Sequence, residues 1–299
     1  MKKTKQLGFL FMTISAIGLA AATILMKLIP VKTNLTPGQV AVWRFAIAAP
    51  LLWLVTLSGK KKVGLPSRQV WELVGLGVVF SAASVLALLS LGRLSSSLYA
   101  ILVYIYPSLV VIYSLITRRP VSRLWWLGVP MTLIGLALTV FNSSQSIQVD
   151  GLGIVLSIMN GVVLAVYNIL GERIFKKVPS RQAGTTWIQT GAMVIGLLLG
   201  FIFGFNLPDT FQGWLLLVSL GVFGTMIPIL ALNYGIQMLG ASQSSVIMTM
   251  QPVMAVIFST IIFSDTLTLQ QWLGGLLVIL AILLLQWTPK QKEVIDFES

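Results

Sequence analysis

The chain has 299 residues, of which 57% are hydrophobic and 9% are charged, and its net charge is +12. A soluble domain of this length has about a quarter of its residues charged, so the composition excludes an ordinary soluble fold. Because the sequence has no histidine and no cysteine, it also excludes histidine-based zinc sites, serine-histidine dyads, thiol nucleophiles and disulfides.

Ten apolar segments of membrane length follow one another along the chain. A helix of about 20 residues crosses the hydrocarbon core, whereas spanning strands have about 10 residues of alternating polarity. The segments are Leu7–Ile29, Pro37–Leu57, Val70–Leu91, Ser95–Thr117, Arg123–Phe141, Leu152–Gly171, Ala183–Phe205, Phe211–Gln237, Ser242–Phe263 and Leu269–Trp287. The sequence therefore predicts an all-α integral membrane protein with ten transmembrane helices.

The first half of the sequence recurs in the second half at an offset of about 145 residues. Leu7-Gly8 corresponds to Leu152-Gly153, and Trp126-Leu127-Gly128 corresponds to Trp272-Leu273-Gly274. Each half has five predicted helices, and an odd number makes the two copies face opposite ways. We therefore predict two inverted five-helix repeats, residues 1–145 and 146–299, with a short cytoplasmic tail at 288–299. Such repeats are typical of carriers whose substrate site lies near the bilayer midplane.

Basic residues mark one side of the predicted membrane. Lys and Arg gather at both termini and in the loops around residues 60–68, 118–123 and 173–181, whereas the loops around 142–150, 206–209 and 265 have none. The positive-inside rule then places both termini in the cytoplasm and the protein in the cytoplasmic (plasma) membrane. The same residues meet anionic lipid headgroups, so the positive charge indicates membrane lipid as a partner and not nucleic acid.

The carboxylates do not form a catalytic pair within the bilayer. The four aspartates fall in loops or in the tail, and Glu72 and Glu172 lie near the cytoplasmic ends of the third and sixth predicted helices. We therefore expect no enzymatic activity, no metal site and no cofactor. Glu172 and its neighbour Arg173 are predicted to form an interfacial ion pair, with a gating salt bridge as the alternative.

Several runs in the second half resemble the end of an EamA-type domain of the drug/metabolite transporter superfamily. They are Leu232–Gln237, Ala241–Ser245, Gln251–Val256, Asp265 and Trp272–Gly275, and the first half repeats the pattern around Pro107 and Trp126–Gly128. The resemblance implies ten helices in inverted repeats around a central cavity, with small metabolites or amino acids carried by alternating access. Family members often have an acid after the fourth and ninth helices. Asp265 fills the second of these positions, but Arg118 and Arg119 stand at the first.

Polar residues at mid-depth are the candidates for lining that cavity. Asn160 lies midway along the sixth predicted helix, and its counterpart Ser15 lies midway along the first. A polar group at this depth bonds to a neighbouring helix or faces a water-filled cavity, and both alternatives stay open. Tyr167 continues the face of Asn160 at helical spacing. Further candidates on the fourth and ninth helices are Tyr99, Tyr104, Ser245, Met248 and Gln251.

Arg44 is a basic residue placed well inside a predicted helix, about two turns from its external end. Such a charge is costly in a bilayer and usually faces a cavity or a partner. Its donors suit a carboxylate or phosphate of the solute, which favours an anion-attracting or gating role. The alternative is a side chain that snorkels to the interface.

Pro107 and Pro252 lie near the centres of the fourth and ninth predicted helices. Each removes a backbone hydrogen bond, so we predict a kink at each position. The kink either serves packing or acts as a moving hinge. The freed carbonyls are expected near Val103 and Met248.

These features together predict a secondary transporter for a small organic solute, an amino acid or related metabolite, with export favoured over uptake. A channel would need a continuous polar stripe or a charged ring, and a non-transporting membrane partner would not need the inverted duplication. Both stay as alternatives. The small-residue spacings from Gly128 to Gly135 and at Gly274-Gly275 favour close packing of the fifth and tenth helices, with a homodimer contact as the alternative.

Overall fold

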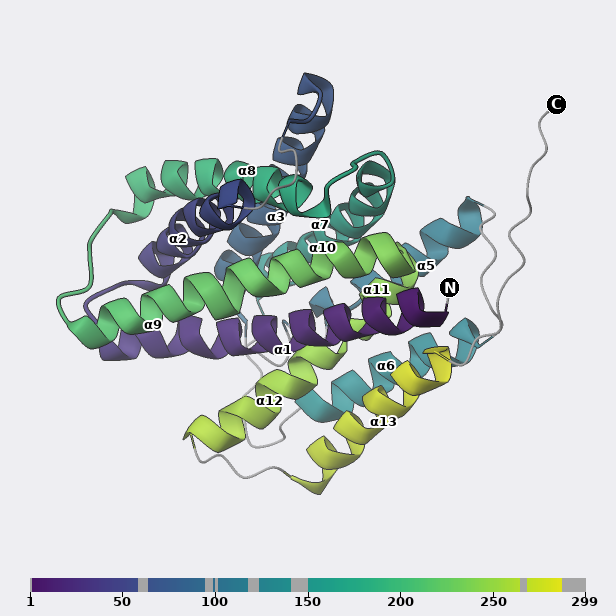
Figure 1. Ribbon diagram of the computed structural model, residues 1–299. Helices are drawn as coiled ribbons and strands as arrows, with labels where there is room; N and C mark the ends of the chain where they lie inside the picture. Colours follow the sequence, from purple (N-terminus) through teal and green to yellow (C-terminus); the bar gives the residue numbers. More distant parts are fainter. Residues whose placement is uncertain are drawn as a thin grey trace.

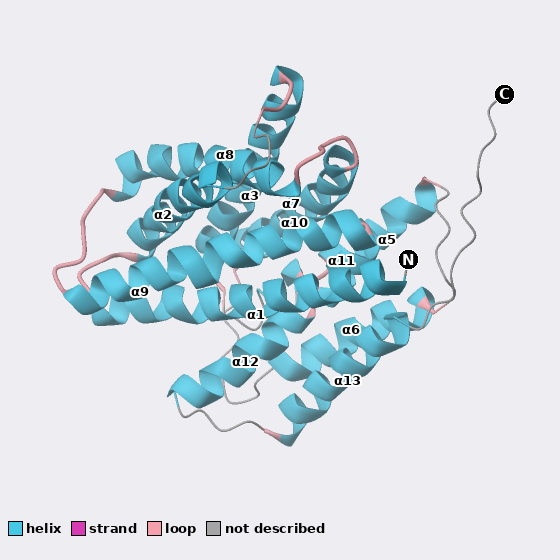
Figure 2. Ribbon diagram, in the orientation of Figure 1, coloured by secondary structure: helices cyan, strands magenta, loops and turns pink. Residues whose placement is uncertain are grey.

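The computed structural model describes residues 2–58, 64–94, 99, 102–117, 124–140, 150–263 and 268–286. These residues form helices and connecting turns, with no strand among them (Figure 2). The elements are α1 (Lys2–Lys32), α2 (Pro37–Ser58), α3 (Ser67–Leu91), α5 (Tyr106–Ile116), α6 (Trp125–Val140), α7 (Gly151–Phe175), α8 (Arg181–Phe203), α9 (Phe211–Gly221), the π-helical turn η1 (Val222–Met226), α10 (Ile227–Leu239), α11 (Ala241–Ile247), α12 (Met250–Phe263) and α13 (Leu269–Gln286). The predicted tail, Asp265, Arg118 and Arg119 lie outside the described residues.

Within the described residues, seven helical segments have the length and apolar composition to cross a membrane. They are Thr4–Lys32, Pro37–Ser58, Ser67–Leu91, Gly151–Phe175, Arg181–Phe203, Phe211–Leu239 and Ala241–Ile262. Three shorter apolar helices, Tyr106–Ile116, Leu127–Leu138 and Leu269–Ala281, fall below this length. The structure thus confirms an all-helical, multi-pass membrane protein, while the count of ten spanning helices stays a prediction.

Helices from the two halves of the chain pack on one another. Figure 1 shows α1 lying alongside the line formed by α9, η1 and α10, and α13 lying alongside α6. In addition, α3 packs against α7 and α8, and α2 packs against α8 and α9. The core between these helices is mostly apolar and includes Phe45, Phe80, Tyr167 and Phe175, all buried.

Glycines allow the closest of these helix contacts. A Cβ added to Gly77 on α3 would lie 2.0 Å from the Ile188 carbonyl oxygen of α8, and one added to Gly191 would lie 2.2 Å from the Val74 carbonyl oxygen. On α6, a Cβ at Gly135 would lie 2.8 Å from the Gly274 carbonyl oxygen of α13. Small residues let helix backbones approach in this way. Gly135 and Gly274 therefore serve packing of α6 on α13 within one chain.

Three helices that follow loops begin with a side-chain cap. Asp150 accepts a hydrogen bond from the Gly153 N–H at 2.8 Å at the start of α7, and Ser180 and Thr210 cap α8 and α9 in the same way. Such caps satisfy N–H groups that have no partner inside the helix. The Gly153 N–H and, less strongly, nearby Arg93 hold the pKa of Asp150 below its usual value.

The fourth and ninth predicted helices are interrupted at corresponding places. α5 begins at Tyr106, directly after a turn at Tyr104 and Ile105, and α12 begins at Met250, after a turn at Met248 and Thr249. Pro107 and Pro252 lie in the first turn after each interruption, where a proline is tolerated because N–H groups there have no helical partner. The helical hydrogen bonds are therefore disturbed just before each proline, while Ile105 and Met248 keep right-handed helical backbone angles. The kinks at Pro107 and Pro252 stay a prediction.

A third irregularity lies between α9 and α10. Pro228 has no N–H to donate, and the turn before it widens into η1, where the Ile227 N–H donates to the Val222 carbonyl. Wide turns of this kind mark places where the regular ladder of helical hydrogen bonds is disturbed, and they are frequent at functional sites. A Cβ on Gly18 of α1 would lie 2.2 Å from Cγ of Pro228, so α1 crosses directly over this segment.

Candidate functional site

Asn160 on α7 faces the interrupted fourth helix. Its side chain is 1% exposed, and its Nδ2 donates to the Tyr99 hydroxyl at 2.8 Å. Its Oδ1 has no hydrogen-bond partner among the described residues. Burying an amide oxygen without a hydrogen-bond partner costs about 1 to 3 kcal/mol of stability. A hydrogen bond donated to this oxygen by a ligand or a water molecule would recover that free energy.

The backbone of the first interruption lies against the same face of α7. A Cβ added to Gly161 would be 3.0 Å from the Val103 carbonyl oxygen, which is the carbonyl that Pro107 cannot bond. Glycine at this position lets the break approach α7 closely. At the second interruption the corresponding carbonyl of Met248 accepts the Gln251 N–H at 3.0 Å.

Tyrosines connect the two interruptions. Tyr104 and Tyr106 have ring centroids 5.9 Å apart, and the Tyr106 hydroxyl donates to the Ser245 carbonyl of α11 at 3.1 Å. Met248 is 4% exposed in the second break itself. We call the residues around the two breaks the break cluster; its members are Tyr99, Tyr104, Tyr106, Asn160, Ser245 and Met248.

The two remaining candidates, Ser15 and Gln251, lie on α1 and α12, which pack against each other. Ser15 is fully buried on α1, which packs against α12 and α11, and its hydroxyl has no partner among the described residues. Gln251 lies in the first turn of α12 and is partly exposed. The hydroxyl of Ser244 on α11 is also buried without a described partner. Several polar atoms near the breaks thus keep free hydrogen-bonding capacity.

Tyr167 belongs to a second polar group, two turns along α7 from Asn160. Its hydroxyl donates to Asn233 Oδ1 on α10 at 2.7 Å, and Asn233 Nδ2 donates to Thr185 Oγ1 on α8 at 3.3 Å. Gln189 lies one turn beyond Thr185, is fully buried, and has no partner for either amide atom within the described part of the chain. The sequence reasoning missed Asn233, Thr185 and Gln189, although an Asn and a Gln inside apolar helices were a visible signal.

Arg44 is buried among α1, α2 and η1. It is 8% exposed, its Nε donates to Thr225 Oγ1 of η1 at 2.9 Å, and its Nη1 lies 3.5 Å from the sulfur of Met26 on α1. The guanidinium also lies over the Phe45 ring, 5.3 Å from its centroid. A charged side chain inside a membrane-spanning helix is costly and usually faces a cavity or a partner.

Glu172 and Arg173 bond to different partners and not to each other. Glu172 accepts from the Ala241 N–H at the start of α11 and from Lys176, each at 3.1 Å, whereas Arg173 bonds to the Tyr113 hydroxyl on α5. The predicted pair of neighbours is therefore wrong. Adjacent helical residues point about 100° apart, so residues one turn apart, such as Glu172 and Lys176, meet instead.

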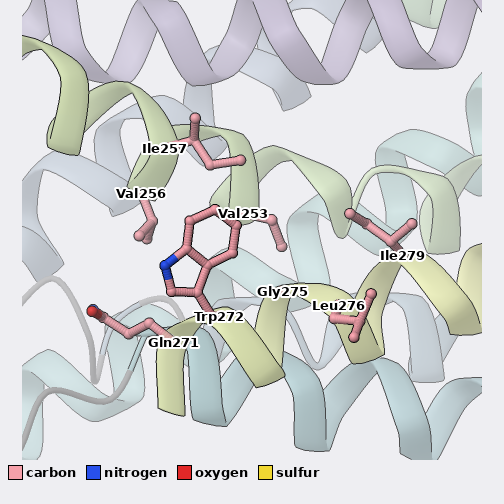
Figure 3. Close-up of a pocket in the computed structure, with 8 residues that line it drawn as sticks. All are labelled: Val253, Val256, Ile257, Gln271, Trp272, Gly275, Leu276 and Ile279. Atoms are coloured by element: carbon pink, nitrogen blue, oxygen red, sulfur yellow. The ribbon is translucent and has the colours of Figure 1, made fainter. Parts of the chain in front are cut away.

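An apolar pocket lies elsewhere, between α12 and α13. Its volume is about 110 Å³, and it is lined by Val253, Val256, Ile257, Gln271, Trp272, Gly275, Leu276 and Ile279. Figure 3 shows the Trp272 ring between the two helices, with the Gln271 side chain pointing away from the pocket. Trp272 and Leu276 are more than half exposed on the outer face of α13. None of the predicted site residues lines this pocket, and its lining suits lipid chains better than a polar solute.

Comparison with known proteins identifies the family to which the chain belongs. The model of the EamA-like transporter family matches the chain twice, at residues 6–141 and 151–287. The chain is 28% identical over 230 residues to "Uncharacterized transporter sll1319" of Synechocystis sp., covering 73% of this chain and 67% of that protein. It is 24% identical over 282 residues to "Uncharacterized transporter YcbK" of Bacillus subtilis, covering 89% and 88%. It is also 24% identical over 251 residues to "Uncharacterized inner membrane transporter YedA" of Escherichia coli K12, covering 83% and 81%.

A solved crystal structure shares the fold. It superposes with a TM-score of 0.76 over 95% of this chain and 96% of that chain, at 15% sequence identity. At this identity the likeness concerns the arrangement of helices alone. The family match covers nearly the whole chain in two parts, and the sequence relatives carry transporter names. The protein belongs to the EamA-like transporter family and is a membrane transporter.

Proposed function

We propose that this protein is a secondary transporter of the cytoplasmic membrane that moves a small organic solute by alternating access, with both termini in the cytoplasm. The solute class is an amino acid or a related metabolite. The observation that carries the proposal is the pair of helix interruptions at corresponding positions of the two halves, with the partly unsatisfied break cluster around them.

Interrupted helices at mid-depth are a recognised device for solute binding in transporters. A backbone carbonyl that loses its helical partner within a membrane is tolerated only where protein buries it or a water-filled cavity reaches it. Paired interruptions in the two halves of a carrier are a sequence-level and structural pointer to the solute site. The free Asn160 oxygen and the buried Ser15 and Ser244 hydroxyls supply hydrogen-bonding groups without a charge.

Reciprocal packing supports the inverted repeat. α3 of the first half packs against α7 and α8, the first two helices of the second half, and the line from α9 to α10 packs against α1 and α2 in return. Because the two sets of contacts are related by the repeat, the protein can adopt two related conformations. In each conformation one set is closely packed and the other is partly opened. Rocking between them around a fixed site is the motion that alternating access requires.

Contacts cross the bundle at both ends in the present conformation. At the end bearing the loop between α8 and α9, Gln39 donates to the Phe203 carbonyl at 3.0 Å and Trp43 donates to the Asn206 carbonyl at 2.8 Å. At the opposite end, Gln237 donates to the Phe175 carbonyl at 2.6 Å, and Glu172 holds the start of α11. We infer that opening to either side breaks one of these sets and keeps the other.

The break cluster contains no carboxylate and no histidine, which favours exchange or uniport over proton coupling through this cluster. The aromatic and uncharged polar side chains suit an organic solute better than a bare ion. These features support a metabolite as cargo.

The test is counterflow in proteoliposomes that contain the purified protein. Vesicles are loaded with single unlabelled amino acids, nucleosides or sugar phosphates, and uptake of the same labelled solute is followed. Saturable counterflow for at least one solute is expected. Flux that does not saturate and has no counterflow would instead identify a channel, and no flux across a broad panel would contradict transport of this solute class.

A further inference from the structure

We propose that Arg44, held by η1, is the recognition site for an anionic group on the solute, so that the cargo carries a carboxylate or a phosphoryl group. The inference rests on the proposed function and specifies the class of solute. It concerns the region where α1, α2 and η1 meet, away from the break cluster.

The first argument is the lack of a compensating charge. Arg44 is 8% exposed, yet its contacts among the described residues are all with uncharged groups: the Thr225 hydroxyl, the Met26 sulfur and the Phe45 ring. Buried arginines in membrane proteins ordinarily pair with a carboxylate or face a polar cavity. No carboxylate within the described part of the chain compensates this positive charge, so it stays available for the anionic group of a solute.

The second argument is the orientation of the guanidinium. The Thr225 hydroxyl donates to the Leu220 carbonyl, five residues earlier, at 2.9 Å, so the threonine oxygen presents its lone pairs to Nε of Arg44. A threonine in the wide η1 turn thus fixes one edge of the arginine fork. Nη1 has only a thioether beside it, and Nη2 has no hydrogen-bond partner in the described part of the chain. The edge formed by Nη1 and Nη2 can bind a carboxylate or phosphate with two parallel bonds.

The third argument is the column of side chains that leads from Arg44 to the polar group at Tyr167. Phe45 lies below the guanidinium, Phe80 lies 6.0 Å from Phe45, and Tyr167 lies 5.2 Å from Phe80, measured between ring centroids. The Tyr167 hydroxyl then reaches Asn233. The order of these groups, a cation followed by aromatic rings and a polar group, matches an acid with an apolar body, which would reach the column when the bundle opens.

The experiment measures ligand-dependent thermal unfolding of the purified full chain in detergent at constant ionic strength. The probes are the amino acids and their C-terminal amides, and sugar phosphates and the corresponding free sugars. If the site recognises a carboxylate, the amino acids bind much more tightly than their amides. If it recognises a phosphoryl group, the sugar phosphates bind much more tightly than the free sugars. For the anion that binds, Arg44→Gln is expected to weaken binding about 10- to 100-fold, as loss of hydrogen bonds to a charged group does, and to leave the neutral analogue unaffected.

Two further variants keep the test independent of folding defects. Arg44→Lys retains the charge but not the fork and is expected to recover part of the affinity, and Thr225→Val is expected to weaken anion binding several-fold by releasing Nε. Ser81→Ala is the matched control, because Ser81 stands at the place in α3 corresponding to Thr225 and bonds only to the Ala192 carbonyl. It is expected to change neither affinity.

Equal loss of affinity for anion and neutral analogue in Arg44→Gln would overturn the inference, as would unchanged anion binding in both Arg44→Gln and Thr225→Val. The outcome is separable from that of the proposed function. Saturable counterflow that does not respond to these variants contradicts only the role of Arg44. Arg44-dependent anion binding without counterflow of any solute contradicts transport and leaves the binding site in place.

Discussion

Asn160 shows at the scale of one residue how this fold keeps polar capacity in an apolar interior. One amide atom binds Tyr99 and the other has no described partner. Interhelical hydrogen bonds in membranes contribute about 0.6 kcal/mol on average and up to about 1.7 kcal/mol. The cost of the unpaired oxygen is therefore as large as the gain from the bond, and a purely structural role does not explain the choice of asparagine.

Substitution of Asn160 by leucine, combined with Tyr99→Phe, is expected to separate stability from transport. Removing both partners leaves no orphaned group, so the unfolding midpoint in detergent should stay close to that of the native protein. Counterflow through the variant should fall at least about tenfold, which corresponds to loss of about 1.4 kcal/mol of interaction with the solute.

Ser157→Ala on the same helix is the matched control for this prediction. The Ser157 hydroxyl is buried one turn before Asn160 and bonds only to the Gly153 carbonyl of its own helix. The unfolding midpoint and the rate of counterflow should both stay close to those of the native protein in this variant. An equal loss of counterflow in the control, or undiminished counterflow in the double variant, would argue against a solute contact at Asn160.

Asp150 is expected to make the stability of the protein depend on pH, because its ionised form caps α7. The Gly153 N–H lowers its pKa in the folded protein, so folding favours the carboxylate. This contribution to stability is fully present above the ordinary pKa of an aspartate, and it is lost as the pH falls through the lowered value. Thermal unfolding at a series of acidic pH values should show a decline that is smaller in Asp150→Asn. Identical pH profiles for both proteins would contradict the cap as the source of the decline.

Among the elements, the glycine crossing of α3 and α8 shows how position along a helix decides the effect of a methyl group. Gly77 and Gly75 lie on the same helix two residues apart. Gly77 faces the Ile188 carbonyl of α8, whereas a Cβ on Gly75 would meet nothing within 4 Å. Because the nearest atoms belong to the backbone and not to a flexible side chain, α8 as a whole would have to shift to make room.

Gly77→Ala is therefore expected to destabilise the protein by about 1 to 3 kcal/mol, the usual cost of overpacking. Gly75→Ala is expected to be neutral or to stabilise by up to about 1 kcal/mol, because alanine is the better helix former. Unfolding of both variants in detergent, monitored by helical circular dichroism, gives the comparison. A similar change in the two variants would mean that α3 and α8 do not cross as closely as described.

The helix interruptions belong to the same scale. Prolines at residues 107 and 252 predict that a helical hydrogen bond is lost one turn earlier, but not which neighbour the freed carbonyl meets. Packing decides this at the first site, because Gly161 lets the Val103 carbonyl lie directly against α7. The π-helical turn before Pro228 arises in a similar way, under α1 at Gly18. Neither outcome is encoded in the helix concerned, since both depend on a glycine in a different helix.

For the whole molecule, the two halves are expected to face opposite sides of the membrane. Lys32 and Lys177 occupy corresponding places in the two halves and are both exposed. In a parallel duplication they would lie on the same side, and in an inverted one they lie on opposite sides.

Single cysteines at Lys32 and Lys177 test this directly, because the chain has no cysteine of its own. A membrane-impermeant maleimide added to intact cells is expected to label Lys32→Cys and to leave Lys177→Cys unlabelled until the membrane is permeabilised. Lys5→Cys should behave like Lys177→Cys and be labelled only after the membrane is permeabilised. Reaction of the two corresponding positions from the same side would contradict the inverted arrangement and, with it, the proposed alternating access.

The sequence by itself determined the membrane environment, the helical class and the approximate extents of most helices, and it identified Asn160, Ser15 and Arg44 as polar residues inside apolar helices. These follow from local hydropathy, since an apolar run of about 20 residues has no stable alternative to a buried or lipid-facing helix. Only the tertiary structure decided that Tyr167 bonds Asn233, that Glu172 holds α11 and not Arg173, and that Arg44 rests on a π-helical turn. The partners of each pair come from helices far apart in the sequence. Hydropathy indicates which segments prefer an apolar environment, but not which helix lies beside a given side chain.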